Sequence, residues 1–229
     1  MPLGLITGAS KGFGRAVARE LAAQGWDLVV DARHAADLTT AFAGCPAVTT
    51  IAGDVTDPLH RDALAATVGD RPLDLLVNNA SLLGPSPQPD LASYPLEELR
   101  RVYETNLVAP LALVQLLLPA LHRAPGTVVN VTSDASVEAY AGWGGYGSSK
   151  AALDHLSAVL AEEQRDLRIY AFDPGDMRTE MHQDAFPGED ISDRPEPEAV
   201  VPALLRLLEH RPPSGRVRAA ALLAPVGAC

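Results

Sequence analysis

The stretch Leu3-Gly4-Leu5-Ile6-Thr7-Gly8-Ala9-Ser10-Lys11-Gly12-Phe13-Gly14, close to the N-terminus, organises the chain. Its first four residues form a short apolar run typical of a buried strand, and after the glycines apolar residues recur every four positions, as in a helix. A strand, a glycine-rich turn and a helix N-terminus form a cradle whose backbone N–H groups receive a pyrophosphate. The spacing G-x-x-x-G-x-G differs from the common dinucleotide fingerprint. The turn therefore indicates a nucleotide site only together with residues further along the chain.

Outward from this stretch, short apolar runs alternate with amphipathic segments. We predict strands at Leu3–Thr7, Asp27–Asp31, Val48–Ile51, Leu73–Asn78, Thr127–Thr132, Arg168–Phe172 and Arg216–Leu222. We predict helices at Gly14–Gln24, Pro58–Val68, Leu96–Leu121 with a break near Thr105, Gly147–Glu163 and Glu198–Leu208. Such alternation predicts βαβ units with right-handed crossovers. The predicted fold is α/β: a single-domain, Rossmann-type, doubly wound parallel sheet of about seven strands with helices on both faces, covering residues 1–229.

Composition excludes several classes of function. The net charge of −11 argues against nucleic acid and anionic membranes as partners. The most apolar segment, Leu107–Leu121, is interrupted by two prolines and falls short of the ~18 residues of a membrane span. Two cysteines, Cys45 and Cys229, make no disulfide scaffold, and the six histidines lack ligand spacing. With no leader before the first strand, we expect a cytoplasmic protein without a metal site.

Tyr146 and Lys150 carry most of the chemical information in the chain. Four residues apart on a predicted helix, the phenol and the ammonium project from one face. A free tyrosine titrates near ~10, and a positive charge beside it pulls its pKa towards the working range of an acid–base group. The same spacing occurs by chance in many helices, so the pair gains meaning from the motifs around it.

Taken in order, these motifs resemble those of the short-chain dehydrogenase/reductase family, from Leu3 to about Thr179. Two departures are Ser81, which replaces the last glycine of the family's N-N-A-G motif, and the C-terminus, which lacks the usual aspartate-glycine-glycine ending. The matching segments are Thr7-Gly8-x-x-x-Gly12-x-Gly14, Gly53-Asp54-Val55, Asn78-Asn79-Ala80, Asn106, Ser133, Tyr146-x-x-x-Lys150 and Pro174-Gly175-x-x-x-Thr179.

The resemblance implies an NAD(P)-dependent oxidoreductase that interconverts a ketone or aldehyde and an alcohol by hydride transfer. Tyr146 would be the general acid/base, and Ser133 would bind the reacting oxygen, with Thr132 as the less well spaced alternative. Lys150 would hold the nicotinamide ribose and lower the pKa of the tyrosine, and Asn106 would hold a water. We expect cofactor contacts from Gly8, Ser10, Lys11, Gly12, Phe13, Gly14, Arg33, Asp54, Val55, Asn79, Ala80, Tyr146, Lys150, Pro174, Gly175, Met177 and Thr179.

Two positions bear on the choice of nucleotide. Asp31, at the end of the second predicted strand, could grip a ribose 2′-OH and favour NAD(H). Aligned from Thr7, however, the family's NAD-selecting aspartate falls on Ala32, and Arg33 stands where NADP-dependent members place an arginine. A guanidinium suits a phosphate dianion, and Lys11 adds a second positive charge. We predict NADP(H), with NAD(H) as the alternative.

The remaining predictions concern substrate and assembly. The proline-rich stretches are Gly84–Pro95 and Phe186–Pro197, and we predict a substrate lid over residues 176–197, which includes the second of them. Asp176 and His182 border the substrate side and either recognise a polar or cationic group or form a solvated edge. A small-molecule substrate and a homodimer through Leu107–Leu121 and Gly147–Glu163 are expected, with a tetramer as alternative. Two other classes stay open: a non-redox epimerase or dehydratase, and an NADP(H)-sensing module, which would tend to lose Tyr146 or Lys150.

Overall fold

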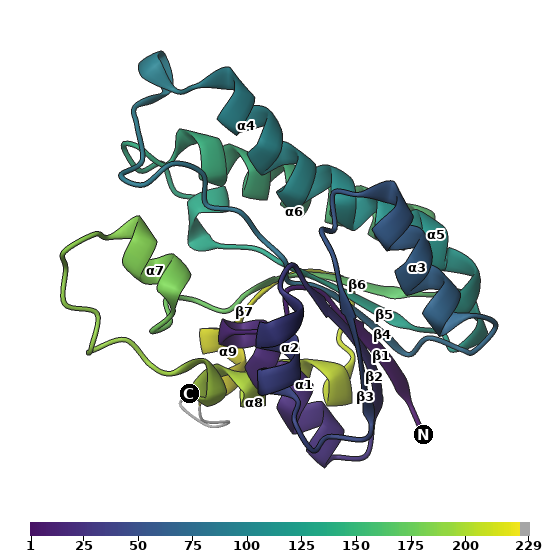
Figure 1. Cartoon of the computed structure of the whole chain (residues 1–229). Helices are drawn as coiled ribbons and strands as arrows, with labels where there is room; N and C mark the ends of the chain where they lie inside the picture. Colours follow the sequence, from purple (N-terminus) through teal and green to yellow (C-terminus); the bar gives the residue numbers. More distant parts are fainter. Residues whose placement is uncertain (225–229) are drawn as a thin grey trace.

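Seven parallel strands form one sheet in the order β3-β2-β1-β4-β5-β6-β7 (Figure 1). This computed structural model describes residues 1–224, so Cys229 lies outside the described residues. The order reverses between β1 and β4, and ligands of such sheets bind beyond the carboxyl ends of the strands at that point. The predicted fold class is confirmed. The strands are β1 (Leu3–Ile6), β2 (Asp27–Ala32), β3 (Val48–Ala52), β4 (Leu75–Asn78), β5 (Thr127–Val131), β6 (Arg168–Asp173) and β7 (Gly215–Arg218).

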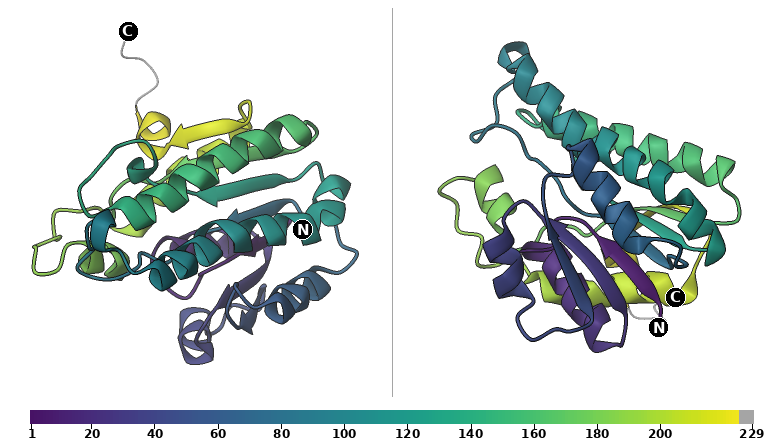
Figure 2. Two further views of the ribbon diagram at one scale, coloured as in Figure 1. Left: turned by 90° about the horizontal axis from the view of Figure 1, so that it is seen from above. Right: turned by 45° about the vertical axis from the view of Figure 1, so that its right-hand side comes forward.

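Helices cover both faces of the sheet, as Figure 2 shows. One face carries α1 (Gly12–Ala23), α2 (Ala35–Ala41), α8 (Pro197–His210) and α9 (Ala219–Leu223). The other carries α3 (Pro58–Val68), α4 (Leu96–Tyr103), α5 (Ala109–Arg123) and α6 (Gly144–Glu163). The short helix α7 (Glu180–Ala185) lies beyond the carboxyl ends of the strands (Figure 1).

Two apolar layers hold these helices to the sheet. Successive side chains of a strand point to opposite faces, so Val30 packs in the layer of α1 and α8, whereas Val29 packs in the layer of α3, α5 and α6. Phe13 of α1 stacks on Phe172 of β6 with ring centres 5.8 Å apart. Because both faces are covered at the centre of the sheet, the fully buried strands β1, β4 and β5 read as nearly continuous apolar runs, which is why the sequence located them well.

The structure corrects the sequence prediction at several elements. The predicted strand Arg216–Leu222 is strand only to Arg218, and Ala219–Leu223 forms α9. That stretch consists of alanine and leucine, which favour helix, and a short apolar run does not distinguish strand from helix. Helices α2 and α7 were not predicted, because six or seven residues carry too little periodicity. Helix α6 begins at Gly144, three residues before the predicted start.

The predicted break near Thr105 is a π-helical turn, Glu104–Val108, inside a helix that continues from Leu96 to Arg123. Pro119 lies inside α5 and does not end it. The continuous helix is long and apolar enough to cross a membrane, but 44% of its most apolar window is already buried inside the fold. Since Leu113 and Leu117 pack in the layer over the sheet, we interpret it as a core helix.

Candidate active site

A cavity of about 590 Å³ opens at the carboxyl ends of the strands, where the strand order reverses. It runs from the glycine-rich turn past Tyr146 to α7. Of the predicted catalytic residues, Ser133, Tyr146 and Lys150 line this cavity and Asn106 does not. Of the predicted cofactor residues, all but Gly14 line it. The fold thus brings together residues spread over most of the chain.

The glycine-rich turn is packed so tightly that Gly8 and Gly14 have no room for a side chain. A Cβ atom at Gly8, where φ is +64°, would lie 2.8 Å from Cα of Ala80, and one at Gly14 would lie 2.7 Å from the carbonyl oxygen of Gly8. Asn79 and Ala80 donate their backbone N–H groups to Oγ1 of Thr7, each at 3.0 Å. The Asn78-Asn79-Ala80 motif therefore braces the turn, and Gly14 acts through packing, which explains its place outside the cavity.

Asp31 is fully buried and is engaged by the protein itself. One oxygen accepts the backbone N–H of Gly8 at 2.8 Å, and the other lies 3.0 Å from Nε2 of His60 on α3. Burial raises the pKa of this carboxyl above its ordinary value, although the contacts with His60 and Gly8 act against the shift. Asp31 is thus a support of the glycine-rich turn. Sequence reasoning missed His60, for which no motif exists.

Arg33 is exposed at the mouth of the cavity. The nearby carboxyl of Asp54 has a pKa below its ordinary value: partial burial raises it, but hydrogen bonds from Thr56 and the charge of Arg33 lower it more. Arg15 of α1 also lines the cavity, and its Nε is buried without a hydrogen-bond partner among the described residues. These guanidinium groups and the open backbone of the turn fit a phosphorylated nucleotide.

Tyr146 is 8% exposed, and its surroundings raise its pKa to about 12. Burial is the main cause, the charges of Asp134 and Asp173 add to it, and hydrogen bonding from Ser81 and Ser133 acts in the opposite direction. The sequence analysis predicted that the pKa of Tyr146 is lowered, whereas its surroundings in the structure raise it. Because a buried phenolate loses its hydration, the tyrosine remains protonated throughout the neutral range.

Lys150 is 2% exposed and donates from Nζ to the carbonyl oxygen of Val131 at 2.8 Å. The ammonium lies 5.5 Å from the centre of the Tyr146 ring. Burial lowers the pKa of Lys150 to about 8, and the charge of Asp154, one helical turn further along α6, partly opposes the shift. The predicted neighbourhood of phenol and ammonium on one helix face is confirmed.

Asn106, in the π-helical turn, acts as a brace through its side chain. Its amide nitrogen donates to the carbonyl oxygen of Leu82 and to Oγ of Ser149, both at 2.9 Å, and its oxygen accepts from the N–H of Leu82 at 2.8 Å. Ser81, the departure from the family's motif, donates to the same oxygen at 3.2 Å. The side chain of Asn106 therefore ties the segment after β4 to α6, and its predicted role in holding a water stays a prediction.

Ser133 follows β5, and its hydroxyl donates to Oδ1 of Asp134 at 2.9 Å. Asp134 also accepts a hydrogen bond from Tyr140 at 3.1 Å. The two candidates at this position are Ser133 and Thr132. A hydrogen bond from the hydroxyl of Ser133 acts to lower the pKa of Tyr146. Oγ1 of Thr132 is buried without a partner among residues 1–224. This geometry favours Ser133, in agreement with the spacing argument.

The substrate end of the cavity is walled by apolar and aromatic groups. Trp143 meets Tyr146 edge-on, with ring centres 5.9 Å apart, and lies 5.6 Å from the ring of Phe186. Leu83 and Met181 pack in the same cluster. The wall thus combines α6, the segment after β4 and the region of α7.

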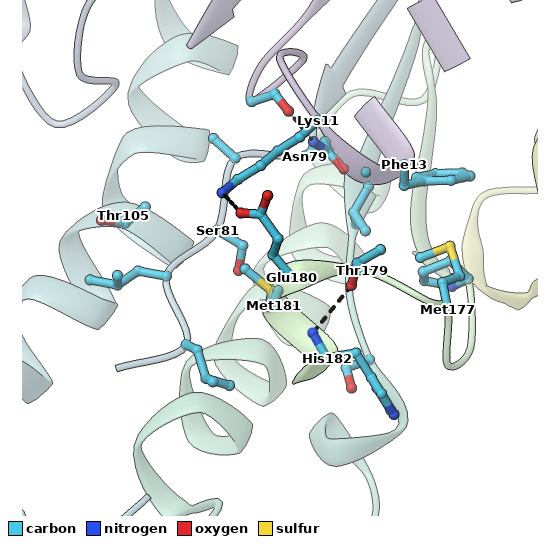
Figure 3. A pocket seen from close by; sticks show the side chains of 18 of the residues that line it. Lys11, Phe13, Asn79, Ser81, Thr105, Met177, Thr179, Glu180, Met181 and His182 are labelled. Atoms are coloured by element: carbon cyan, nitrogen blue, oxygen red, sulfur yellow. Dashed lines mark hydrogen bonds and ion pairs between the residues drawn. The ribbon is translucent and has the colours of Figure 1, made fainter. Parts of the chain in front are cut away.

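Helix α7 is tied to the glycine-rich turn by an ion pair between Lys11 and Glu180 (Figure 3). The hydroxyl of Thr179 caps the helix by accepting the N–H of His182 at 3.2 Å. Nδ1 of His182 lies 3.8 Å from Oδ1 of Asp176. The two residues predicted at the substrate side therefore face each other.

Comparison with known proteins identifies the family. The short chain dehydrogenase family model matches residues 3–190. The chain is 36% identical over 189 residues to serine 3-dehydrogenase of Agrobacterium fabrum (77% of this chain, 72% of that protein). It is 34% identical over 221 residues to L-xylulose reductase of Mesocricetus auratus (90% and 88%). A short-chain dehydrogenase structure from Shigella flexneri, complexed with NADP, superposes with a TM-score of 0.89 at 28% identity (96% and 97% covered). The chain belongs to the short-chain dehydrogenase/reductase family and is an NAD(P)-dependent oxidoreductase acting on CH–OH and C=O groups.

Proposed function

We propose that the protein is an NADP(H)-dependent carbonyl reductase in which Tyr146 is the general acid. The observation that carries this proposal is the convergence of Tyr146, Lys150 and Ser133 on one cavity that also holds the glycine-rich turn. Bound nicotinamide would supply the hydride. The alternatives of a non-redox enzyme and of a nucleotide sensor have no support from the relatives, which are oxidoreductases.

The chain's own residues would handle the oxygen of the substrate. Reduction of a carbonyl builds negative charge on that oxygen, and hydroxyl groups held in place stabilise it. Ser133 and Tyr146 offer two such groups at one end of the cavity. With a pKa of about 12, Tyr146 carries its proton at neutral pH and is ready to donate it. Tyr146 is thus in the protonation state that carbonyl reduction requires.

Replacing Tyr146 by phenylalanine tests the mechanism. Tyr146→Phe keeps the ring against Trp143 but removes the proton donor, so kcat should fall ~10²–10⁴-fold. Steady-state kinetics of NADPH oxidation over a panel of carbonyl compounds measures it, and NADPH binding should persist. Tyr103→Phe, a tyrosine outside the cavity lining, is the matched control. Near-wild-type turnover by Tyr146→Phe would overturn the assignment.

The choice of NADP(H) rests on Arg33 and Asp31. The carboxylate of Asp31 is occupied by Gly8 and His60, so it does not take the part of an NAD-selecting aspartate. Arg33 is exposed beside the cavity and available to a 2′-phosphate. Lys11 contributes less than the sequence suggested, because Glu180 competes for its charge.

Substitution of Arg33 tests the preference. A charge-assisted contact of ~1.5–3 kcal/mol corresponds to about a ten- to hundredfold change in affinity. Arg33→Ala should weaken NADPH binding by that factor and leave NADH binding nearly unchanged, as measured by fluorescence titration. Arg100→Ala on α4, outside the cavity, is the control. Tighter binding of NADH than of NADPH by the wild type would refute the proposal.

The substrate class follows from the cavity wall. Trp143, Leu83 and Met181 surround Tyr146 with apolar surface, and Asp134 places a carboxylate beside Ser133. We infer that the carbonyl carries an apolar neighbouring group and no anionic one. The relatives are named for serine, L-xylulose and benzil, three unlike compounds, so a panel that varies charge and apolar size is the appropriate screen.

A further inference from the structure

We propose that Arg216 of β7 is a positioning residue that holds Ser133, helix α6 and the turn after β6 in one arrangement. The inference rests on the proposed function, because it concerns the geometry of the same site. Arg216 lies beyond residues 3–190, which the family model matches, and belongs to none of the motifs of the sequence.

One guanidinium group joins three elements. Nε of Arg216 donates to Oδ2 of Asp154 on α6 at 3.0 Å. Nη2 donates to the carbonyl oxygen of Ser133 at 3.0 Å and to Oδ2 of Asp173 at 2.9 Å. These partners lie 62, 83 and 43 residues away in the sequence. No other contact among the described residues joins all three.

Each partner leads to a part of the site. Asp173 accepts the N–H of Gly175 at 3.0 Å through its second oxygen, so it shapes the turn that begins the segment Pro174–Thr179, which is predicted to contact the cofactor. Asp154 follows Lys150 by one helical turn and accepts the hydroxyl of Ser136 at 2.6 Å. Movement of the guanidinium group would therefore displace Ser133, helix α6 and the turn after β6.

The groups around Arg216 are buried, so their charges require partners inside the protein. Side-chain exposure is 24% for Arg216, 15% for Asp154 and 2% for Asp173. A carboxylate as buried as Asp173 is retained only with a partner that supplies charge and hydrogen bonds. The planar fork of arginine provides several donors in fixed directions, whereas lysine presents one nitrogen. Lysine at this position would keep the charge and lose part of the arrangement.

Arg216 also sets the charge balance around Tyr146. The charged groups acting on the phenol are Lys150 on its own helix, Asp134 after β5 and Asp173 at the end of β6, and His182 of α7 lines the same cavity. From β7, Arg216 neutralises Asp173 through the contact between Nη2 and Oδ2. Without it, the negative charge of Asp173 would act on Tyr146 more strongly.

Three variants of the full-length enzyme test the proposal: Arg216→Met, Arg216→Lys and the control Arg218→Met. Arg218 lies on the same strand, is 67% exposed, and approaches Asp173 only to 3.6 Å. Thermal unfolding and NADPH titration establish the folded, nucleotide-binding fraction of each. Two quantities are measured per binding site. The first is kcat and KM for carbonyl reduction. The second is kcat for alcohol oxidation as a function of pH, which has a rising limb because kcat increases as Tyr146 loses its proton.

Arg216→Met should lower kcat roughly ten- to a hundredfold, the effect of displacing reacting groups by about 1 Å, with a smaller change in KM. It should also move the rising limb of the oxidation profile to higher pH, because the negative charge of Asp173 would raise the pKa of Tyr146 further. Arg216→Lys should lower kcat but keep the limb at the wild-type position, and Arg218→Met should resemble the wild type in both. A role in stability alone would reduce the folded fraction and leave kcat per site and the limb unchanged.

If Arg216→Met folds too poorly to measure, Arg216→Lys decides: kcat per site equal to that of Arg218→Met overturns the inference. For Arg216→Met, kcat within twofold of Arg218→Met with an unshifted limb overturns it as well. Failure of the proposed function would look different. In that case the wild type and Arg218→Met would themselves show no nucleotide-dependent turnover on the carbonyl panel.

Discussion

At the scale of single residues, the site keeps an unfavourable charge inside the protein. Lys150 is buried with one hydrogen bond, from Nζ to the carbonyl oxygen of Val131, and its pKa falls to about 8. A lysine in an unfolded chain titrates near ~10.4. Below pH 8 both states of the protein bind this proton, and the native state bears the full penalty of desolvation. Function, and not stability, explains an ammonium at this place.

Lys150→Met should therefore stabilise the protein while abolishing its activity. At pH 7 a pKa lowered from ~10.4 to about 8 corresponds to roughly 3 kcal/mol, less the lost hydrogen bond. Between pH 8 and about 10 the unfolded wild type binds more protons than the folded one, so the stability of the wild type rises with pH. The advantage of Lys150→Met should shrink over that range. Urea unfolding at pH 7 and pH 9.5 measures both values, and a variant less stable at pH 7 would contradict the argument.

At the scale of elements, α7 and its flanking loops meet several parts of the site. The Glu180 side chain pairs with Lys11, Phe186 packs on Trp143, and Oγ of Ser86 donates to the carbonyl oxygen of Asp184 at 2.6 Å. The first proline-rich loop thus contacts α7. We propose that residues 176–197 act as a lid on a single domain and close further when nucleotide is bound.

Limited proteolysis tests the lid. NADPH should slow cleavage within residues 186–196, because closure protects exposed backbone. Glu180→Gln removes the ion pair with Lys11 and should speed cleavage of the nucleotide-free protein about two- to fivefold, since an exposed pair contributes ~0.2–1 kcal/mol. Glu189→Gln, also on the exposed loop, serves as control. Equal cleavage with and without NADPH would argue against a closing lid.

At the scale of the whole molecule, α5 and α6 lie side by side over the sheet (Figure 2). Val108 is 43% exposed, Leu116 41% and Val159 42%. An interface that joined these exposed side chains would bury their apolar surface. We propose a homodimer through these helices, with a tetramer as the alternative.

Leu116→Glu combined with Val159→Glu should split the assembly, because the twofold interface would then bring carboxylates into contact. Sedimentation velocity of the wild type and the double variant measures the mass. The dimer should become a monomer with unchanged secondary structure, and Leu59→Glu on α3, where Leu59 is 76% exposed, should leave the mass unchanged. A monomeric wild type would disprove the proposed interface.

Patterns in the sequence were enough to predict the parallel sheet, its approximate strands and the pairing of Tyr146 with Lys150. These features depend on neighbours in the chain: strand runs, helical spacing and glycines in a tight turn are local patterns. The boundary between β7 and α9 was missed because Ala219–Leu223 satisfies either pattern until its packing is known.

The surroundings of the reacting groups, by contrast, depend on how distant segments pack together. The tertiary structure buried Tyr146 and moved its pKa upward, engaged Asp31 with Gly8 and His60, and brought Arg216 to Ser133. The physical reason is that burial and charge act through space. Ser133 and Arg216 are 83 positions apart in the chain and meet because β5 and β7 flank the same strand, β6, and no local pattern records that approach.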